Sequence, residues 1–430
     1  MNKRKIINDP VYGFITIPTD LLYDLIQHPY VQRLRRIRQL GLTDLVYPGA
    51  LHTRFHHALG AMHLMGEALE NLRRKGTLIW DVEREAAQAA ILLHDVGHGP
   101  FSHVLERSVL QGVPHERVSR LIMNHLNQHF GGALDLAVQM FSGTYERPFF
   151  HQLISSQLDV DRLDYLKRDC YFTGVLEGSI GASRILKMLA VHNGELVVEE
   201  KGIYTIESFL NARRVMYWQV YLHKATVAAE QMMVQVIRRA RELSGTGEKL
   251  FASPPLRCFL GEQVTWQQLT EPAYLEAFTC LDDYDLWTSI KVWAEHDDPL
   301  LSWLSRSLRD RQLFRVRLSN EPFAPELIAE LREKTRQELD FTGGELDYVV
   351  PHGSVRNAAY MPSASSIKVL TKAGGVVDIV EASDLPNLRG FGQVVEKHFV
   401  CWPREVPPHV PTAPALPPAP QETSGRLWEE

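Results

Sequence analysis

The segment from Ala89 to Pro100 places an apolar run directly before a polar cluster of two histidines and an aspartate. The apolar part has the composition of a buried helix, and His94, Asp95 and His98 follow it. Burying imidazoles and a carboxylate costs free energy unless they are hydrogen-bonded, paired with charge or bound to a cation. A metal ion would supply the missing partner. We therefore interpret His94 and Asp95 as candidate metal ligands.

Further ligands must come from elsewhere in the chain, because neighbouring residues of a helix point about 100° apart. His57, at the start of another predicted helix, and Asp161 are the two candidates. The four residues provide two nitrogens and two oxygens, which suit Mn, Fe, Ni, Zn or Mg better than a thiophilic metal. A single histidine is more often an ordinary core residue. The combination of four favours a metal site with open positions for water and a phosphate oxygen.

In its motifs, the sequence resembles the HD-domain phosphohydrolases, and within them the branch of dGTPases and SAMHD-type deoxynucleoside triphosphate triphosphohydrolases. The ligand order and the contiguous stretch from His94 to His103 carry the resemblance. Other matching segments are Asn8 to Pro10, Gln32 to Arg35, Gln39 to Gly41, Pro48 to Ala50, Arg54 to Gly60, His115-Glu116, Asp159 to Asp169 and Arg213 to Lys224. A bare His-Asp pair is weak evidence, but this series is specific. The C-terminal part of the chain matches only loosely.

The resemblance implies attack at the α-phosphorus of a deoxynucleoside triphosphate (dNTP), which releases a deoxynucleoside and intact inorganic triphosphate. The departing 5′ oxygen needs a proton, and histidine suits that exchange near neutral pH. The candidates are His98, His103 and His115. By resemblance, His98 and His115 contact the α-phosphate and relay protons, whereas His103 faces the leaving oxygen.

The phosphate charges of such a substrate require cations, and the planar fork of arginine matches phosphate oxygens. The candidates at positions that match the family are Arg54, Arg162, Arg213 and Lys224. Each of them alone is more often a solvated surface charge. Arg162 departs from the lysine of the mammalian relative, which keeps the charge but changes the hydrogen-bond geometry.

Sugar recognition is expected from residues on one helix face, because Tyr165 and Asp169 lie four residues apart. By resemblance, the residues that bind the 3′ hydroxyl are Tyr165, Asp169, Gln39 and Leu40. In the relatives, the residues that match Leu40 and Tyr221 crowd the 2′ carbon, which favours deoxyribose. Tyr217 and Tyr221, also four apart, are equally well explained as aromatic residues of a helix core.

A basic helix is predicted between Pro29 and Leu40, with Arg33, Arg35, Arg36 and Arg38. Its plain interpretation is a solvated or salt-bridged surface. In the mammalian relative, the matching stretch helps to bind an activating nucleotide between subunits. The residues that resemble parts of that site are Asn8, Gln32 and Arg35. Gln27 replaces an aspartate that recognises guanine there, so guanine-specific activation is not expected, and the resemblance implies a homo-oligomer, a tetramer or a dimer.

The elements that must position these residues are mainly helical. From about Thr19 to Leu243, apolar residues recur at helical spacing, and Thr19 caps a helix that runs to Ile26. Alternation of Leu196, Val198 and Tyr204 around Glu199 to Gly202 predicts a small hairpin near residues 191–206. We expect residues 1–318 to form a helical HD core that contains this hairpin.

The pattern changes after about Ser319. One helix, Pro325 to Glu338, precedes strand-like segments at Tyr348 to Val350, Ile367 to Leu370 and Val376 to Val380. These predict a small α+β region at 319–402. The proline-rich tail at 403–430 is predicted to be disordered. The expected fold class is thus mainly α, with an HD-domain helical core and a small α+β C-terminal appendage.

Composition excludes several classes of protein. The 430 residues carry a net charge of −6, from 46 basic and 52 acidic residues, so nucleic acid is an unlikely partner. The apolar runs are far shorter than the roughly 20 residues of a membrane span, and no signal peptide opens the chain. We therefore expect a cytoplasmic protein without a membrane partner. Four cysteines without a CxxC pair favour buried thiols over disulfides or a thiolate metal site.

Two other functions remain open at this point. An HD hydrolase that acts on another nucleotide phosphoester, such as a nucleoside monophosphate or a cyclic nucleotide, would share the metal ligands. The sugar-side residues Gln39, Tyr165 and Asp169 argue against it. A non-catalytic nucleotide sensor or single-stranded nucleic-acid binder is disfavoured by the intact metal ligands and by the acidic net charge.

Overall fold

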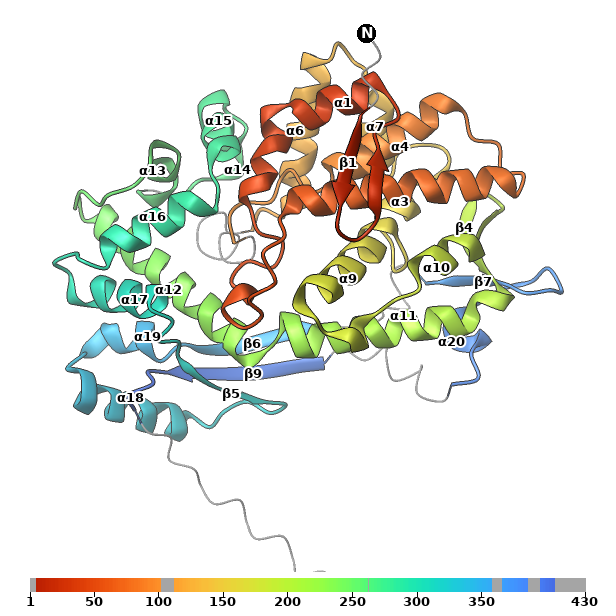
Figure 1. The fold of residues 1–430 in the computed structure, drawn as a ribbon. Helices are drawn as coiled ribbons and strands as arrows, with labels where there is room; N and C mark the ends of the chain where they lie inside the picture. Colours follow the sequence, from red (N-terminus) through yellow and green to blue (C-terminus); the bar gives the residue numbers. More distant parts are fainter. Residues whose placement is uncertain (1–4, 102–111, 262, 358–365, 386–394, 407–430) are drawn as a thin grey trace, which may run out of the picture.

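The computed structural model of the chain describes residues 5–101, 112–261, 263–357, 366–385 and 395–406. Within these ranges the chain is mainly helical, as the sequence predicted, and most helices contribute to one hydrophobic core (Figure 1). Two small sheets, which together contain the C-terminal strands, lie beside the helices (Figure 1). The fold class, mainly α with a small α+β C-terminal part, is therefore confirmed.

The N-terminal half starts with an antiparallel hairpin of β1 (Ile6–Asp9) and β2 (Gly13–Thr16). The helical elements that follow are α1 (Asp20–Gln27), α2 (Pro29–Gln32), η1 (Arg33–Arg36), η2 (Thr43–Leu45), α3 (Arg54–Arg74), α4 (Asp81–Leu93), α6 (His115–His129), α7 (Asp135–Ser142), α8 (Pro148–Ile154) and α9 (Val160–Thr173). Helix α3 packs against both α4 and α9. These three helices carry the predicted metal ligands.

The helix predicted from Pro29 to Leu40 is shorter in the structure. Helix α2 ends at Gln32, one 3₁₀ turn follows, and the backbone is extended at Ile37. Arg38 then forms a β-bridge with Thr53, the residue before α3. This bridge requires an extended backbone and explains why the helix stops early. It also holds the residues after Arg38 alongside the start of α3.

The second half of the core consists of helices. They are η3 (Leu176–Gly178), α10 (Ala182–Met188), η4 (Glu200–Gly202), α11 (Ile203–Met216), the π-helical turn η5 (Tyr217–Tyr221), α12 (Lys224–Gly245), α13 (Pro254–Leu260), α14 (Trp266–Leu269), α15 (Pro272–Cys280), α16 (Asp283–Trp293) and α17 (Pro299–Arg309). The long helix α12 packs against α13 and α17. Functional sites often contain π-helical turns such as η5.

The predicted hairpin exists, but it lies earlier than expected. Strands β3 (Leu189–His192) and β4 (Glu195–Glu199) pair across a turn at Asn193-Gly194, where φ is 52° and 80°. Asparagine and glycine tolerate these left-handed angles, so they set the turn. Residues 200–202 form η4, and Tyr204 belongs to α11 instead of a strand. The hairpin also accepts two C-terminal strands, which gives the sheet order β3-β4-β7-β8.

The C-terminal region is α+β, as predicted. Its elements are β5 (Arg315–Ser319), α18 (Pro325–Leu339), η6 (Gly343–Glu345), α19 (Leu346–Val349), β6 (His352–Asn357), β7 (Lys368–Leu370), β8 (Val376–Asp378), α20 (Ile379–Ala382) and β9 (Val395–Trp402). Strand β9 pairs antiparallel with both β5 and β6. The strand predicted at Tyr348 to Val350 is wrong, because α19 occupies it. The strand predicted at Val376 to Val380 ends at Asp378, whose side chain caps α20.

Several smaller expectations concern the chain as a whole. Of the four cysteines, Cys170 and Cys401 are buried, Cys258 and Cys280 are exposed, and all are free thiols. No helix in the described ranges is long and apolar enough to cross a membrane. Residues 407–430 of the predicted disordered tail lie outside the described residues.

Candidate active site

Three helices bring the predicted metal ligands together. His57 lies in the first turn of α3, His94 follows α4 directly, and Asp161 lies in the first turn of α9. Nε2 of His57 is 3.3 Å from Nε2 of His94 and 3.1 Å from Oδ1 of Asp161. Oδ1 of Asp95 is 3.3 Å from Nε2 of His94. The ligand atoms of His57, His94 and Asp161 therefore lie within 4.8 Å of one another, and Asp95 contacts His94 beside them.

The donor chemistry of this group fits a divalent cation. Nδ1 of His57 is 2.7 Å from Oδ2 of Asp164, and Nδ1 of His94 is 2.6 Å from the backbone oxygen of Ile91. These acceptors place the ring protons on Nδ1, so the two Nε2 atoms of the neutral rings carry lone pairs. Two lone pairs that face each other at 3.3 Å repel, and either a proton on one ring or a metal cation bound by both rings would remove this repulsion. The four residues could hold such an ion.

The carboxylates give the site a preference for positive charge. Burial lowers the pKa of His57, but hydrogen bonds with Asp161 and Asp164 outweigh burial and raise this pKa to about 10. Burial also opposes protonation of His94, whereas the Asp95 charge and Asp161 raise its pKa. Burial alone would raise the pKa of Asp161, yet the two histidines hold it well below its usual range. A divalent cation would satisfy the same carboxylates.

Arg54, the first residue of α3, is paired with the cluster. Its Nη1 donates a hydrogen bond of 2.6 Å to Oδ2 of Asp95, and both side chains are buried. Burial raises the pKa of Asp95, but the charges of His94, His98 and Arg54 outweigh it and hold this pKa well below its usual range. Arg54 thus keeps Asp95 ionised and in place.

Two further histidines form a stack beside Asp95. The rings of His98 and His115 are 3.7 Å apart and inclined by 21°, and Nε2 of His98 is 3.3 Å from Oδ1 of Asp95. Burial and the Arg54 charge hold the pKa of His98 well below its usual range. Two stacked imidazolium ions would repel each other strongly. A positive charge on one of these rings therefore disfavours a positive charge on the other. His103, the third predicted catalytic histidine, lies outside the described residues.

A cavity of about 420 Å³ opens beside the cluster. Its walls include His94, Asp95, Asp161 and the histidine stack. The predicted substrate-binding residues that line it are Gln39, Leu40, Arg54, Arg162, Tyr165, Asp169, Tyr217 and Tyr221. Segments far apart in the sequence thus meet around one space beside the metal ligands.

Comparisons with known proteins agree with this arrangement. The model of the HD domain family matches residues 54–169, which include all four candidate ligands, and that of the HD associated region matches residues 180–252. The uncharacterized protein YwfO of Bacillus subtilis is 36% identical over 323 residues, which are 73% of this chain and 72% of YwfO. This chain belongs to the HD-domain phosphohydrolase family.

One solved structure and one named relative provide further comparisons for this HD protein. The crystal structure of a phosphohydrolase from Bacteroides thetaiotaomicron is similar with a TM-score of 0.90 and 51% identity, over 94% of this chain and 100% of that one. The deoxynucleoside triphosphate triphosphohydrolase SAMHD1 of Homo sapiens is 28% identical over 329 residues. The matching region covers 66% of this chain and 52% of the human protein, so the HD protein spans about half of that relative.

Asp169 of the HD domain is held from two sides. Nε2 of His52 is 2.7 Å from its Oδ1, and the hydroxyl of Tyr221 donates a 2.7 Å hydrogen bond to its Oδ2. His52 is completely buried and stacks on Phe172. Sequence reasoning missed His52, although it stands between two recognised motifs and a buried Asp169 needs partners. Tyr221 lines the cavity and its hydroxyl binds Asp169, so this tyrosine is more than a core aromatic residue.

The four predicted phosphate clamps of the HD protein separate into two groups. Arg54 and Arg162 line the cavity, and Arg162 is paired with Asp159, the N-cap of α9. Arg213 is buried and donates a 3.0 Å hydrogen bond to Gln157. Lys224 does not line this cavity; it lines a second one at the start of α12. The structure therefore brings two of the four clamps to the catalytic cavity.

The predicted regulatory residues lie outside the catalytic cavity of the HD protein. Asn8 belongs to β1, whereas Gln32 and Arg35 are neighbours at the junction of α2 and η1. Nε of Arg35 donates a 2.8 Å hydrogen bond to Gln32, and its guanidinium lies over Phe55. The predicted basic helix face is only partly solvated, because Arg33 is buried.

Buried Arg33 joins the loop after α4 to the residues before α16. It donates hydrogen bonds to the backbone oxygens of Leu281 (2.7 Å), Val96 (3.2 Å) and His98 (2.8 Å). The loop that carries His98 is thereby fixed to the residues before α16. Sequence analysis had assigned this arginine to a surface, and no local signal separates it from its neighbours.

Proposed function

We propose that this HD protein hydrolyses dNTPs to deoxynucleosides and inorganic triphosphate with the help of a divalent metal ion. The main supporting observation is that one cavity is lined both by candidate metal ligands and by Asp169 with its partners. The polar atoms around Asp169 are suited to bind a sugar hydroxyl. The relatives named as dNTP triphosphohydrolases, such as SAMHD1 of Homo sapiens and of Gallus gallus, support this substrate class.

Each group in the cavity has a role in the proposed reaction. His57, His94, Asp95 and Asp161 would hold the ion, which is Mn, Fe, Mg, Ni or Zn. When bound, such an ion polarises a phosphate oxygen and acidifies a water molecule. Arg54 and Arg162 neutralise phosphate charge, and the stacked pair of His98 and His115 contacts the α-phosphate and moves one proton. His103 is proposed to protonate the leaving 5′ oxygen.

The sugar side of the cavity accounts for a preference for deoxyribose. Gln39, Leu40 and Tyr165 line the wall together with Asp169, and Tyr221 is fixed by its hydrogen bond to Asp169. A ring held in this way cannot retreat from a 2′ hydroxyl. Tyr217 also lines the cavity, with its ring 5.1 Å from that of Tyr221, and Arg213 donates a hydrogen bond to Gln157.

The proposal is tested by hydrolysis assays with each dNTP and its matching ribonucleotide, before and after removal of metal by a chelator. We expect dNTPs to be hydrolysed in preference to ribonucleotides, activity to disappear on chelation, and added Mn²⁺ to restore it. Turnover of nucleoside monophosphates or cyclic nucleotides in place of dNTPs would show that the sugar-side assignment is wrong.

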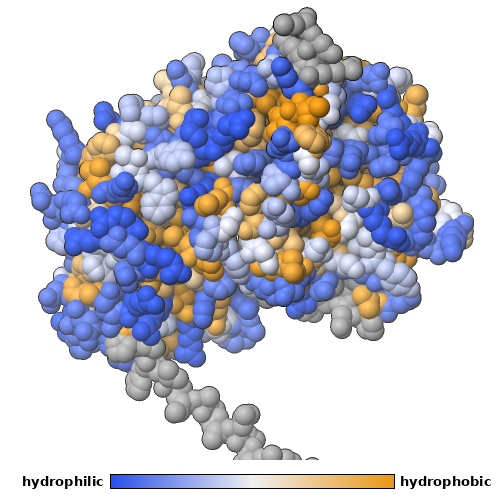
Figure 2. All heavy atoms as spheres, in the orientation of Figure 1, coloured by the Kyte–Doolittle hydropathy of each residue, from blue (hydrophilic) through white to orange (hydrophobic). Residues whose placement is uncertain are grey.

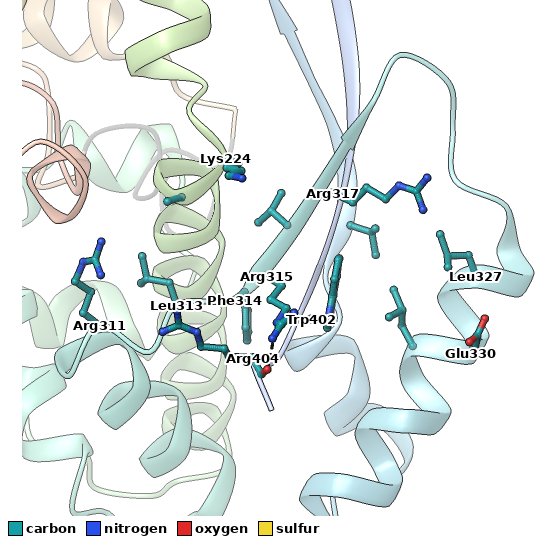
Figure 3. A pocket seen from close by; sticks show the side chains of 14 residues that line it. Lys224, Arg311, Leu313, Phe314, Arg315, Arg317, Leu327, Glu330, Trp402 and Arg404 are labelled. Carbon is teal, nitrogen blue, oxygen red and sulfur yellow. Dashed lines mark hydrogen bonds between the residues drawn. The ribbon is translucent and has the colours of Figure 1, made fainter. Parts of the chain in front are cut away.

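We also propose that bound nucleotide activates the enzyme. A second cavity, of about 830 Å³, lies between α12, β5, β9 and α18 (Figure 3). Its cationic lining residues are Lys224, Arg311, Arg315, Arg317 and Arg404. Phe314 and Trp402 lie among them (Figure 3), and the single acidic lining residue, Glu330, pairs with Lys334. Such a cavity suits phosphates joined to an aromatic base.

We further propose that the protein forms a homo-oligomer, a tetramer or a dimer. Figure 2 shows an apolar group of atoms beside the grey N-terminal residues, over the β1–β2 hairpin of Figure 1. Ile6 and Phe14 of that hairpin are 64% and 71% exposed. Exposed apolar groups of this kind favour contact with another chain. The regulatory candidate Asn8 lies on the same hairpin, so an interface there would bring it close to a partner.

A further inference from the structure

A row of buried charged residues connects the N-terminal hairpin to the candidate metal centre. Oδ2 of Asp164 is 2.7 Å from Nδ1 of His57 and accepts a 3.0 Å hydrogen bond from Nε of Arg168. Nη2 of Arg168 donates to the other oxygen of Asp164, at 3.0 Å, and Nη1 donates to Oδ2 of Asp9, at 2.7 Å. The row runs from Asp9 in β1 to a candidate metal ligand in α3.

Asp9 also holds the turn of the hairpin. Its Oδ1 accepts backbone hydrogen bonds from Val11 (2.9 Å) and Tyr12 (3.0 Å). Its Oδ2 accepts from Nη1 of Arg168, and Oδ1 also accepts a longer hydrogen bond, of 3.4 Å, from Nη2 of Arg168. The geometry of the turn and the position of the Arg168 guanidinium are therefore set by one carboxylate.

The row is tightly enclosed. The side chains of Asp164 and Arg168 are completely buried, and that of Asp9 is 2% exposed. A Cβ atom added at Gly60 of α3 would lie 1.9 Å from Oδ1 of Asp164 and 2.2 Å from Nη2 of Arg168. The absence of a side chain at this position lets α3 approach the ion pair and carry His57 to Asp164.

The contacts of Asp164 decide the orientation of His57. A carboxylate that accepts from the ring Nδ1 of a metal-binding histidine fixes the tautomer and the direction of Nε2. Asp164 uses the same oxygen, Oδ2, for His57 and for Nε of Arg168. If the guanidinium shifts, the carboxylate rotates and the imidazole follows it. The position of Arg168 depends in turn on Asp9.

We infer that Asp9 and Arg168 are positioning residues that orient His57 through Asp164, so that the geometry of the metal centre depends on the docked β1–β2 hairpin. This inference rests on the metal site of the proposed function, but it does not require dNTPs to be the substrate. The Asn8-Asp9-Pro10 motif does not line the catalytic cavity, and this inference gives the motif a role.

The test measures binding of Co²⁺ to the full-length protein after removal of metal, by titration and by the visible spectrum of the bound ion. The variants are Asp9→Asn and Arg168→Lys, which keep the size or the charge of the side chain. We expect both to bind Co²⁺ about ten-fold to a hundred-fold more weakly and to show a changed spectrum, as found when partners of metal-binding histidines are lost.

The matched control is Arg239→Lys, because Arg239 forms a similar two-pronged pair with Asp298 far along the chain. The free energy of unfolding of each metal-free variant is measured in urea. A merely structural role predicts wild-type Co²⁺ affinity and spectrum in every variant that folds, and that result would overturn the inference. Asp9→Asn alone decides the question if Arg168→Lys does not fold.

The outcome is separable from the proposed function. Weaker Co²⁺ binding in the two variants supports the inference even when the wild-type protein hydrolyses no dNTP, which would count against the substrate assignment alone. Unchanged Co²⁺ binding beside normal dNTP hydrolysis would overturn the inference and leave the proposed function in place.

Discussion

The chemistry of the site follows from which atoms of each residue are already occupied. Nδ1 of His57 and Nδ1 of His94 have acceptors, so their Nε2 atoms remain for a ligand. Asp95 divides its oxygens between Arg54 and the two histidines beside it. Asp169 receives His52 on one oxygen and Tyr221 on the other. The candidate metal ligands and the group around Asp169 are thus each held in place by other residues of the chain.

Replacing His94 and Asp95 together by alanine should abolish hydrolysis and leave the helical fold largely intact. The double change removes two candidate ligands and leaves the apolar residues of α4 in place. Activity and far-UV circular dichroism are measured side by side. His125→Ala, on the exposed face of α6, is the control and should retain activity. Residual activity of the double variant near the wild-type level would refute the metal assignment.

Tyr221→Phe should weaken substrate binding, because it removes the hydrogen bond to Asp169 but keeps the ring. The expected loss is about 1 kcal/mol, or roughly a five-fold rise in KM for a dNTP, with a smaller change in kcat. Tyr217→Phe serves as the control, since its hydroxyl has no hydrogen-bond partner among the described residues. Equal KM values in the two variants would mean that Asp169 is not the sugar-binding group.

At the residue scale, the proximity of the candidate ligands could be predicted, because together they are residue types that a helix core rarely contains. The residues that hold those candidate ligands in place could not be predicted. Asp164 and Arg168 are ordinary helix residues in the sequence, and their importance comes from contacts with α3 and β1. Lys224 was placed with the phosphate clamps, but the structure puts it at the second cavity.

At the scale of the elements, close packing of α3 against α9 brings His57 to Asp164 and Asp161. Gly60→Ala should disrupt this packing, because the new Cβ would meet Asp164 and Arg168 well inside contact distance. The expected result is a loss of more than about 1 kcal/mol in the free energy of unfolding. Gly245→Ala, where nothing lies within 4 Å, is the control and should be neutral or stabilising. Equal effects in denaturant titrations would contradict this packing.

Helix α16 is joined to the active-site loops by Asp283, which accepts backbone hydrogen bonds from Arg38 (2.9 Å) and Phe101 (3.3 Å). Burial raises the pKa of Asp283 to about 7. The folded protein therefore holds this proton more strongly than the unfolded chain, in which the pKa is about 3.9. The resulting stabilisation is complete below about pH 4 and is lost as the pH rises towards 7.

We expect this group to reduce the free energy of unfolding by up to about 1.4 kcal/mol per pH unit in that range. Urea titrations of the wild type and of Asp283→Asn between about pH 4 and 7 measure this change in the free energy of unfolding, because the asparagine side chain does not titrate. The advantage of the wild type over the variant should shrink with rising pH. Parallel curves would show that folding does not raise the pKa of Asp283.

The long elements could be predicted from helical spacing, whereas short ones depended on contacts that the sequence does not display. Helix α18 was expected from Pro325 to Glu338 and ends at Leu339. The helix from Pro29 stopped early because Arg38 pairs with Thr53. The hairpin was misplaced because the Asn193-Gly194 turn was overlooked, and its pairing with β7 joins residues far apart in the chain.

At the scale of the whole molecule, two cavities divide the proposed tasks, with catalysis in the HD domain and activation beside the C-terminal sheet. Arg315→Ala combined with Arg317→Ala should leave the basal hydrolysis of a single dNTP unchanged and abolish the stimulation that a second nucleotide gives. Arg336→Ala, an exposed arginine of α18, is the control. Full stimulation in the double variant would place the activator elsewhere, with Asn8, Gln32 and Arg35 as the remaining candidates.

The central claim is hydrolysis of a dNTP at its α-phosphorus. The most direct measurement incubates the purified protein with Mn²⁺ and each dNTP, alone and in mixtures, and identifies the products by chromatography. We expect equal amounts of deoxynucleoside and intact inorganic triphosphate. Release of monophosphate, diphosphate or deoxynucleotide products, or no turnover with any dNTP mixture, would contradict it.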